Sequence, residues 1–436
     1  MTASRTVRLG LRENLGQFAL LVAVTAFVGA MVGLERSTLP LIGRHDFGLR
    51  SSAAVLSFVV AFGLAKAVTN LAAGGLAERA GRRRLLVAGW ALALPVPLLV
   101  AVAPSWPFVV VANALLGVNQ GLTWSMTVVM KVDLVGPRRR GFALGLNEAA
   151  GYGGVAAAAA LSAWLATGLD ARDVLVVASA GIAVVALLVS LVFVRDTAPH
   201  VALEQRESRD HPTGETEPRL RGAFAAASYR VPALRACSQA GLVNNLNDAL
   251  AWGLVPLFLA AHGAGVGEIG LVAGIYPAVW GVGQIATGHW SDRVGRKPPI
   301  VAGMLLQALA LGLLAASRGA VGLAVVAAVS LGCGTALVYP TLIAAISDHV
   351  SPIARAPTIG VYRFWRDSGY VFGGLIAGFV ADSLGYGGAI ALVAGLTAAS
   401  GVWVAIDMPG ERDDVQRASG APIDHEPTVG LPHFGP

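Results

Sequence analysis

Ionisable side chains stand inside the most apolar stretches of this chain, where each one is costly to bury and needs a physical reason. Asp248 lies in the stretch GLVNNLNDALAW, among three asparagines. At helical spacing Asn244 and Asn245 each share a face with Asp248, so we expect a polar stripe that faces an interior cavity. The stripe predicts a site for a proton or a polar solute. The alternative is a hydrogen-bond cluster that only holds helices together.

A second ionisable group lies in the stretch MVGLERSTLPLI, where Glu35 and Arg36 precede Pro40. Glu35 is a candidate for a carboxyl group that exchanges protons beside the cation of Arg36, at the outer mouth of a helix. The alternative is a pair at the end of the helix, close to water.

Long apolar helices must position these side chains. Apolar residues make up 55% of the 436 residues and charged residues 13%, and the mean hydropathy is +0.66. The run from Val174 to Val194 holds 21 uncharged residues, about 30 Å of helix, which matches a bilayer core. The apolar runs lack the alternation of a barrel. We therefore predict twelve membrane helices, at about residues 15–38, 50–73, 85–103, 107–131, 143–166, 173–194, 236–260, 266–288, 299–317, 320–347, 358–381 and 387–406.

The composition turns polar and charged between the sixth and seventh predicted helices, over residues 195–221. A stretch of this kind is typical of a solvated linker. We therefore expect a six-helix bundle over residues 1–194, a cytoplasmic linker over 195–232 and a second six-helix bundle over 233–407. A disordered cytoplasmic tail is expected over 408–436.

The positions of the basic residues predict the orientation, because Lys and Arg accumulate on the cytoplasmic side of membrane proteins. With both termini inside, 23 of the 32 basic residues fall in inner segments, five in outer segments and four within spans. We therefore expect a multi-pass protein of the inner (plasma) membrane with both termini in the cytoplasm. The net charge of +6 then mainly reflects the basic residues that set the orientation in the membrane, and attraction to anionic lipid is a secondary effect.

One charged stretch occurs twice in this apolar chain, at an offset of 214 residues. The two copies are GGLAERAGRR over 74–83 and GHWSDRVGRK over 288–297. Gly81 and Gly295 allow a chain reversal that a side chain would hinder. Glu78 and Asp292 could accept hydrogen bonds from a helix N-terminus in the other bundle, where the helix dipole favours negative charge. The turns comprise Gly74, Glu78, Arg79, Gly81 and Arg82 in one copy, and Gly288, Asp292, Arg293, Gly295 and Arg296 in the other.

The second copy, G-x-x-x-D-R-x-G-R-K, resembles the signature of the loop between helices 2 and 3 in the major facilitator superfamily. The first copy has Glu78 in place of the aspartate and Arg83 in place of the lysine. The resemblance spans roughly residues 12–407. It implies an all-α membrane protein with twelve transmembrane helices in two parallel six-helix repeats, secondary transport by alternating access, and a latch that closes the cytoplasmic side. The alternative for the turns is that they only set topology and anchor to lipid.

Further charges lie at matching depths of the fifth and eleventh predicted helices. Glu148 lies in the fifth, and Arg363, Arg366 and Asp367 lie in the eleventh. We predict a charge network between the two halves; a proton relay through Glu148 is the alternative. Aromatic side chains suit amphipathic solutes. The predicted substrate cavity therefore takes in Arg36, Asn244, Asn245, Trp124, Trp252 and Tyr276.

The resemblance favours proton-coupled export of a drug or metabolite. However, Gly117 in LLGVNQGLTW stands where drug antiporters usually carry an arginine, and GYGG over 151–154 only echoes their helix-5 pattern. Proton-coupled uptake or exchange of an organic anion is the alternative that Arg36, Lys66, Arg363 and Arg366 suggest. A membrane receptor or assembly partner of the same fold is the non-transport alternative.

An enzyme is not expected, because the eight histidines are scattered and mostly in loops. The chain has no nucleotide-binding loop of the form G-x-x-x-x-G-K-[ST], so an ion or substrate gradient must supply the energy. We expect no cofactor and no metal. The expected partners are a small-molecule substrate, a proton or other ion gradient and the lipid bilayer, with no nucleic acid, and the protein is expected to be a monomer.

Overall fold

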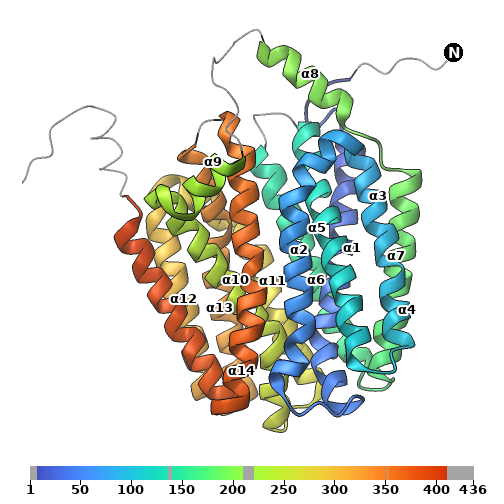
Figure 1. Cartoon of the computed structure of the whole chain (residues 1–436), viewed down its shortest axis with the longest axis vertical. Helices are drawn as coiled ribbons and strands as arrows, with labels where there is room; N and C mark the ends of the chain where they lie inside the picture. The colour runs from blue at the N-terminus through green and yellow to red at the C-terminus, as the bar shows by residue number, and fades with distance from the viewer. Residues whose placement is uncertain (1–6, 136–139, 210–219, 351, 410–436) are drawn as a thin grey trace, which may run out of the picture.

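The structure is a computed structural model of the whole chain and describes residues 7–135, 140–209, 220–350 and 352–409. All regular elements in these ranges are helices. The first half, on the right in Figure 1, is a bundle whose third membrane crossing is built from two short helices, since Pro95 interrupts the helix after Leu94. Its helices are α1 (Leu15–His45), α2 (Ser52–Ala80), α3 (Arg82–Ala93), α4 (Pro95–Ala101), α5 (Trp106–Val135), α6 (Arg140–Leu165) and α7 (Ala171–Val192).

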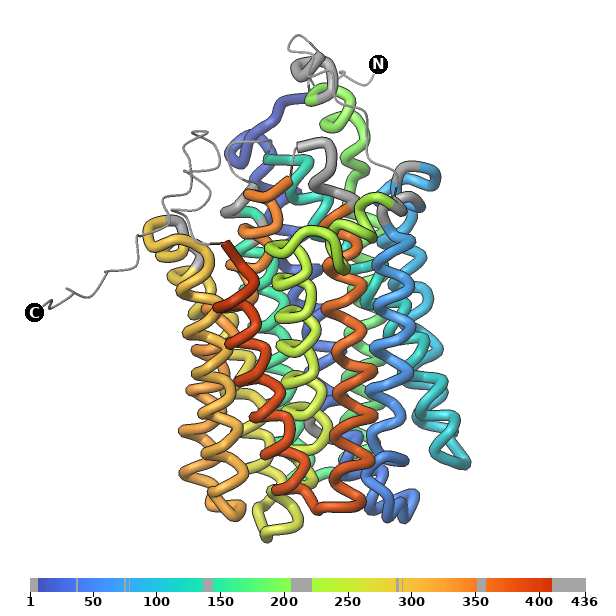
Figure 2. The backbone as a smooth tube through the Cα atoms, turned by 60° about the vertical axis from the view of Figure 1, so that its left-hand side comes forward, coloured from blue at the N-terminus to red at the C-terminus, as the bar shows by residue number. Residues whose placement is uncertain are grey.

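The second half repeats this plan on the left of Figure 1. Its longest helix, α14, is bent where Gly385 adopts a φ of 75°, so that α14 crosses the bundle twice in opposite directions. Figure 2 shows the two arms, orange and red, rising from one bend. The helices are α10 (Pro232–Ala261), α11 (Val266–Val294), α12 (Lys297–Ala316), α13 (Val321–Asp348) and α14 (Pro352–Asp407).

Eight stretches of the described chain are long and apolar enough to cross a membrane, and one of them contains both arms of α14. Helices α5, α6 and α10 are 26 to 30 residues long, and the buried polar residues of α5 and α10 lower their hydropathy. Together these elements make twelve crossings in the described residues. This is the predicted all-α fold of two parallel six-helix repeats.

The duplicated turns lie at the same place in both halves, between α2 and α3 and between α11 and α12. Gly81 and Gly295 have φ values of 87° and 84°, in the region that L side chains rarely adopt. The chain therefore reverses at these two glycines, as expected. We call the end of the bundle that holds these turns and the linker the linker end. The opposite end, which holds the α1–α2 turn and the bend at Gly385, is the far end (Figure 1).

The two halves meet along α2 with the first arm of α14, and along α6 with α11. At the far end α14 approaches α2 so closely that a Cβ atom on Gly378 would lie 2.6 Å from the Cα atom of Ala53. Beside this contact, Asp382 of α14 accepts hydrogen bonds from the Ser51 hydroxyl at 2.5 Å and from the backbone N–H of Ser52 and of Ala53. Direct contacts therefore join the halves at the far end.

The linker between the halves folds into α8 (Ala198–Arg209), α9 (Leu220–Ala225) and the short π-helix η2 (Ala226–Arg230). Thr197 donates a hydrogen bond to Asp133 at the end of α5 at 2.6 Å, and Asp196 accepts one from the backbone N–H of Arg83 at 3.1 Å. The start of the linker is therefore fixed to the first half. Residues 210–219, and the predicted tail beyond residue 409, lie outside the described residues.

Candidate functional site

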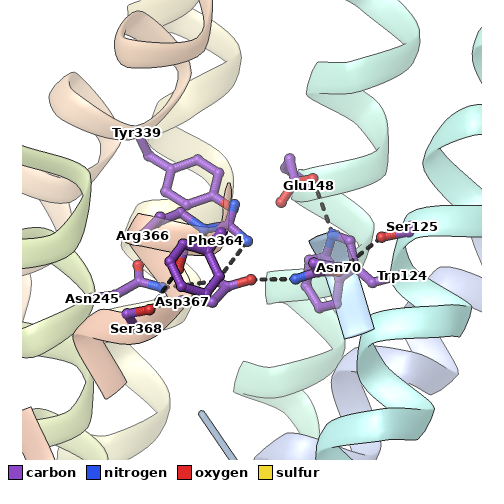
Figure 3. A network of polar contacts seen from close by, with 10 residues as sticks. All are labelled: Asn70, Trp124, Ser125, Glu148, Asn245, Tyr339, Phe364, Arg366, Asp367 and Ser368. Atoms are coloured by element: carbon purple, nitrogen blue, oxygen red, sulfur yellow. Dashed lines mark hydrogen bonds and ion pairs between the residues drawn. The ribbon is translucent and has the colours of Figure 1, made fainter. Parts of the chain in front are cut away.

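A polar network crosses between the two halves (Figure 3). Asp367 on α14 is fully buried and pairs with Arg366 at 2.7 Å. It also accepts hydrogen bonds from Asn245 of α10 at 3.2 Å and from Asn70 of α2. Because Asn70 belongs to the first half, Asp367 joins the two halves directly.

Neighbouring side chains extend this network into both halves. Arg366 donates to the hydroxyl of Tyr339 on α13 at 2.5 Å, and Ser125 of α5 donates to Asn70 at 2.9 Å. Arg363, which was grouped with Arg366 and Asp367 from the sequence, is half-buried, and its Nε atom has no hydrogen-bond partner in the described part of the chain. The structure thus brings Arg366 and Asp367 together and leaves Arg363 beside them.

Glu148 lies across from Arg366 in the first half (Figure 3). One of its oxygens accepts from the Trp124 indole N–H at 3.1 Å and from the Asn147 amide at 3.0 Å. Its Oε2 atom is buried without a hydrogen-bond partner in the described residues. This half-satisfied carboxyl group can take up a proton at Oε2 without breaking an existing hydrogen bond.

Asp248 is fully buried between helices of the second half. It accepts a hydrogen bond from the hydroxyl of Tyr276 on α11, which lies 3.3 Å from the Thr335 hydroxyl of α13. The other carboxyl oxygen of Asp248 has no hydrogen-bond partner among the described residues. Asp248 therefore resembles Glu148 in having one satisfied and one unsatisfied oxygen.

The asparagines around Asp248 do not form one stripe. Asn244 accepts a hydrogen bond from Gln307 of α12 at 3.0 Å, whereas Asn245 turns to Asp367. Asn247 bonds both Gln307 and Thr397, so it belongs to the packing of the second half. Helical spacing placed these side chains near one another, but they bond to residues of two different helices, α12 and α14.

Arg36 forms a second site between the halves. It lies inside α1, which continues past Pro40 to His45, and its exposed fraction is 1%. The alternative interpretation of Glu35 and Arg36, a pair at a helix end close to water, is therefore wrong, because both side chains are buried in the bundle.

Aromatic rings surround the Arg36 guanidinium. Its central carbon lies 4.4 Å from the ring centre of Phe62 and 5.4 Å from that of Phe58, both on α2, and 5.7 Å from that of Trp252 on α10. The rings of Trp252 and Tyr370 stack at 5.9 Å beside them. We call these four aromatic residues around Arg36 the arginine cage.

The four rings of the arginine cage surround the Arg36 guanidinium but accept none of its hydrogen bonds. All three guanidinium nitrogens of Arg36 are buried without a hydrogen-bond partner in the described residues, and so is Oε2 of Glu35. Ring faces attract a cation by about 0.5–2 kcal/mol each. An unpaired buried charge costs several kcal/mol. The guanidinium is therefore ready to receive an anion with two oxygens, such as a carboxylate.

Two prolines help to position the arginine cage. Pro40 and Pro256 each lack a backbone N–H, so the carbonyl groups four residues earlier, those of Arg36 and Trp252, lose their usual helical partner. Arg36 and Trp252, which face each other across the halves, thus lie where α1 and α10 each lack one backbone hydrogen bond. Such points are where a helix bends when packing changes.

Lys66 lies between the arginine cage and the central network. Its ammonium group is 5.5 Å from the ring centres of Phe62 and Tyr370 and 5.4 Å from that of Trp124. No ion pair of Arg36 or Lys66 with a carboxylate is found in the described chain. The interior therefore offers two cations that lie against aromatic rings and form no direct ion pair within the described residues.

A second group of rings connects the halves beside the network. The ring of Tyr152 on α6 lies tilted against that of Trp280 on α11 with ring centres 3.5 Å apart, and Trp124 and Tyr339 flank this pair. The three aromatics predicted for the cavity are thus divided: Trp252 belongs to the arginine cage, Trp124 bonds Glu148 and Tyr276 bonds Asp248.

The duplicated turns carry the same ion pair in each half. Arg82 pairs with Asp133 at 2.7 Å, and Arg296 pairs with Asp348 at 2.8 Å. Arg79 and Arg293 are exposed. The side chains of Glu78 and Asp292, and the positions of Gly74 and Gly288, belong to the part of the turns whose surroundings the structure does not describe, so the predicted latch contacts stay predictions.

Several residues of these sites were missed from the sequence, among them Phe58, Phe62, Asn70 and Asp382. Phe58 and Phe62 look like ordinary apolar residues of α2, and only the packing of α1 on α2 brings them to Arg36. Asn70 and Asp382 carried a weak signal, since each is a polar residue in an apolar helix. No group of three or more metal-ligating side chains occurs in the described ranges.

Comparisons with known proteins agree on the family. The profile of the Major Facilitator Superfamily matches residues 15–239 and 237–430. The chain is 25% identical to an uncharacterized MFS-type transporter of Salmonella typhimurium (strain LT2), over 74% of this chain and 79% of that one. It is also 31% identical to the uncharacterized MFS-type transporter YddS of Bacillus subtilis (strain 168), over 30% of this chain and 31% of that one.

Among solved structures, the chain is similar to a crystal structure of a mutant of the nucleoside transporter NupG. The TM-score is 0.70 at 14% sequence identity, over 90% of this chain and 100% of that one, which shows the shared fold. The profile covers both six-helix repeats, and the resemblance of the duplicated turns is thereby confirmed. The chain therefore belongs to the major facilitator superfamily and is a membrane-embedded secondary transporter.

Proposed function

We propose that this transporter carries a small organic anion, whose carboxylate or similar group binds Arg36 in the arginine cage, and that proton movement drives the transport. The observation that supports the anion is the buried guanidinium of Arg36, which no described side chain satisfies. Lys66 adds a second cation, which lies against the rings of Phe62 and Trp124 and forms no ion pair in the described chain. An anion that arrives between the halves would replace a costly unpaired charge with a bidentate pair.

The proton is proposed to bind one of three carboxyl groups that each have a buried oxygen without a hydrogen-bond partner in the described residues. Asp248 is the leading candidate, and Glu35 and Glu148 follow. Each has one buried oxygen without a partner in the described residues, so protonation there removes a buried charge, and at Asp248 and Glu148 it keeps the existing hydrogen bonds. A proton that enters with the anion, or leaves as the anion enters, keeps the charge of the interior low as the halves move.

The orientation is also a proposal. We place the linker end in the cytoplasm of a cell with an inner (plasma) membrane, because the basic residues collect there. Reporter fusions after Arg209 and after Asp407 should both report a cytoplasmic location. A signal from the other side of the membrane at either position would reverse the orientation.

Counterflow in proteoliposomes tests the substrate class. Vesicles that contain the purified protein are loaded with one member of a panel of monocarboxylates, dicarboxylates, neutral nucleosides and cationic drugs, and exchange is measured with and without a pH gradient. We expect exchange for organic anions, and accumulation only when a pH gradient is present. The direction of the gradient that drives accumulation distinguishes uptake from the export that the sequence favoured.

Two substitutions at Arg36 test the site itself. Arg36→Gln should lower the affinity for the anion about 30-fold or more, since removing one partner of a buried charge pair costs about 2–5 kcal/mol. Arg36→Lys keeps the charge but loses the planar fork, so it should retain part of the affinity. Arg172, which bonds backbone carbonyls of the first half, is the matched control, and Arg172→Gln should leave affinity unchanged. Exchange of neutral or cationic compounds alone, unaffected by Arg36→Gln, would overturn the proposal.

A further inference from the structure

Lys131 is a buried cation of the first half that takes no part in the proposed anion site. It lies on α5, about one helical turn before this helix ends at Val135, and its exposed fraction is 0%. No ion pair of Lys131 with a carboxylate is found in the described chain. Because an unpaired charge is costly to bury, a compensating group is expected beyond its direct contacts.

A chain of buried polar groups connects the Lys131 ammonium group to Glu148. The Nζ atom donates to the hydroxyl of Thr25 on α1 at 2.7 Å and to the backbone carbonyl of Leu21 at 3.3 Å. The Thr25 hydroxyl hydrogen is shared between that carbonyl, at 2.8 Å, and Oδ1 of Asn147 on α6, at 3.3 Å. The Asn147 amide then donates to Glu148 at 3.0 Å. Three helices of the first half therefore contribute to one chain that leads from a cation to a carboxyl group.

The hydrogen bonds of this chain run in one direction, from Lys131 to Glu148. The ammonium group only donates, and the bonded carboxyl oxygen accepts from Asn147 and also from the Trp124 indole N–H at 3.1 Å. Thr25 and Asn147 have exposed fractions of 0%, so solvent is kept away from the chain. In such surroundings aligned hydrogen bonds polarise one another, and a positive end favours a negative end. Among the described residues, Glu148 is also the acidic group whose charge acts on Lys131.

Other charged and titratable groups near Glu148 are Lys66 of α2, Tyr152 of α6, Tyr339 of α13 and the Arg366–Asp367 pair of α14. Arg366 lies across from Glu148 in the second half, so its distance from Glu148 changes when the halves move (Figure 3). Lys66 is assigned to the proposed anion. The chain from Lys131 lies within the first half, so it can stay intact throughout that motion.

We propose that Lys131 is the counter-charge of Glu148 and positions this carboxylate through the hydrogen-bond chain. Glu148 then serves as a fixed negative charge that Arg366 meets when the halves close, and it does not carry the transported proton. In this last respect the inference rests on the proposed function, where it leaves Asp248 and Glu35 as the candidates for the proton. The bonded oxygen of Asp248 accepts from a neutral tyrosine, and no chain of this kind leads to it from a cation in the described residues.

Rescue by a second substitution tests the charge pair. Lys131→Met should lower the thermal midpoint of the purified full-length protein by about 5 °C or more, because the Glu148 charge then lacks its partner. Adding Glu148→Gln should restore most of that decrease, since replacing both members of a buried pair leaves no uncompensated charge. Adding Asp248→Asn, which neutralises another buried carboxyl group, is the matched control and should not restore the midpoint.

Each result supports or overturns the pair. If Lys131 were only a hydrogen-bond donor to Thr25 and Leu21, its loss would also lower the midpoint, but Glu148→Gln would not restore it, and the proposal would be wrong. An unchanged midpoint in Lys131→Met, or equal rescue by Asp248→Asn, would overturn it as well. If Lys131→Met does not fold, recovery of folded protein on adding Glu148→Gln is the same rescue, and no recovery contradicts the pair.

Transport measurements separate this inference from the proposed function. In proteoliposomes Glu148→Gln should keep accumulation driven by a pH gradient, at a reduced rate, because Glu148 does not carry the proton. Loss of accumulation with counterflow intact would place the proton on Glu148 and overturn that part of the inference. If organic anions show no counterflow, or if their counterflow is unaffected by Arg36→Gln, the proposed function fails. The rescue of Lys131→Met would still stand in that case, because thermal midpoints require no substrate.

Discussion

Two helices that correspond in the repeat, α2 and α11, begin in different ways. They start at Ser52 and Val266, 214 residues apart. At the start of α11, Glu268 of the same helix accepts a hydrogen bond from the backbone N–H of Gly265 at 2.8 Å. The residue at the matching position of α2 is Ala54, and there the acidic group comes from the other half, as Asp382 of α14.

The difference concerns what must break when the halves move apart. The Glu268 contact lies within one helix, so it survives any rigid motion of the halves. The Asp382 contact joins two halves, so opening the far end must remove it. An acidic residue at a helix start stabilises that helix in both cases, but only Asp382 also stabilises one conformation of the transporter.

The same contrast holds in the interior. At the offset of 214 residues, Asp248 corresponds to Leu34 and Lys66 corresponds to Trp280. The turns and their ion pairs are repeated, whereas these interior charges are not. The repeat therefore preserves the scaffold, and the chemistry between the halves comes from residues that only one half carries.

Asp248→Asn should have the largest effect on function. The amide can still accept the hydrogen bond from Tyr276 but cannot take up a proton, so accumulation against a gradient should fall at least about tenfold while counterflow continues. Accumulation and counterflow are measured in the same vesicles. Glu35→Gln and Glu148→Gln are compared in parallel, because each of these residues also has one unsatisfied oxygen.

Each outcome for Asp248→Asn has a separate meaning. Loss of accumulation alone assigns the proton to Asp248. Full activity would show that Asp248 is only a structural partner of Tyr276. Glu35 would then be the next candidate for the residue that binds the proton. Loss of binding as well would place Asp248 in the substrate site.

Asp382→Ala should shift the conformational balance toward a state that is open at the far end. Loss of a helix cap costs about 0.5–2 kcal/mol, which corresponds to about a 2- to 30-fold change in the equilibrium. A cysteine at Leu56, which is buried and faces Gly253 of α10, reports the opening through labelling by a membrane-impermeant maleimide. The experiment uses a background in which Cys237 and Cys333 are replaced by serine.

Glu268→Ala is the matched control from the repeat. It removes the corresponding acidic group from α11 but breaks no contact between halves, so labelling of the cysteine at position 56 should change less than twofold. Equal labelling in both variants would show that Asp382 acts only as a helix cap.

The sequence predicted the fold well because the fold depends on long-range patterns. Apolar run lengths, basic turns and one repeated offset each extend over tens of residues, so an error of a few residues does not change the result. The main local error was at the end of α1. The predicted span ended at residue 38 since Glu35, Arg36 and Pro40 lower the hydropathy there, but the helix continues to His45.

The site was harder to predict, because it depends on which helix meets which. Spacing on α10 correctly placed Asn244, Asn245 and Asp248 within one turn of each other. However, Gln307, Asp367 and Tyr276 come from three other helices and divide the group. The arginine cage likewise requires Phe62 from α2 and Trp252 from α10, and no local pattern around Arg36 indicates either.

Asp292→Asn tests the repeated turn, with Glu78→Gln as its counterpart in the first half. If each carboxylate stabilises a helix N-terminus of the other half, its loss should cost about 0.3–1 kcal/mol and change the transport rate about two- to fivefold. Insertion should be normal since the arginines of the turn remain. Transport rates are compared at equal abundance in the membrane. A rate unchanged in both variants would leave these turns with a topological role alone.

Asp133→Asn and Asp348→Asn should have the smallest effects, and unequal ones. The Asp133 side chain is 10% exposed, pairs with Arg82 and accepts the Thr197 hydrogen bond that fixes the linker. The Asp348 side chain is 51% exposed, and Arg296 also donates to Ser291 at 2.8 Å. Charged hydrogen bonds contribute about 1.5–3 kcal/mol when buried, and exposed pairs about 0–1 kcal/mol.

The expected result is therefore a clear decrease in thermal midpoint for Asp133→Asn and almost none for Asp348→Asn, measured on the purified protein. Thr197→Ala separates the two contributions at Asp133, because it removes the linker contact and leaves the ion pair with Arg82. If Thr197→Ala reproduces most of the decrease, the linker explains the inequality between the two turns. If it has no effect and the two aspartate variants still differ, burial of the Arg82 pair is the cause. Equal midpoints for Asp133→Asn and Asp348→Asn would mean that the two turns are alike in energy despite their different surroundings.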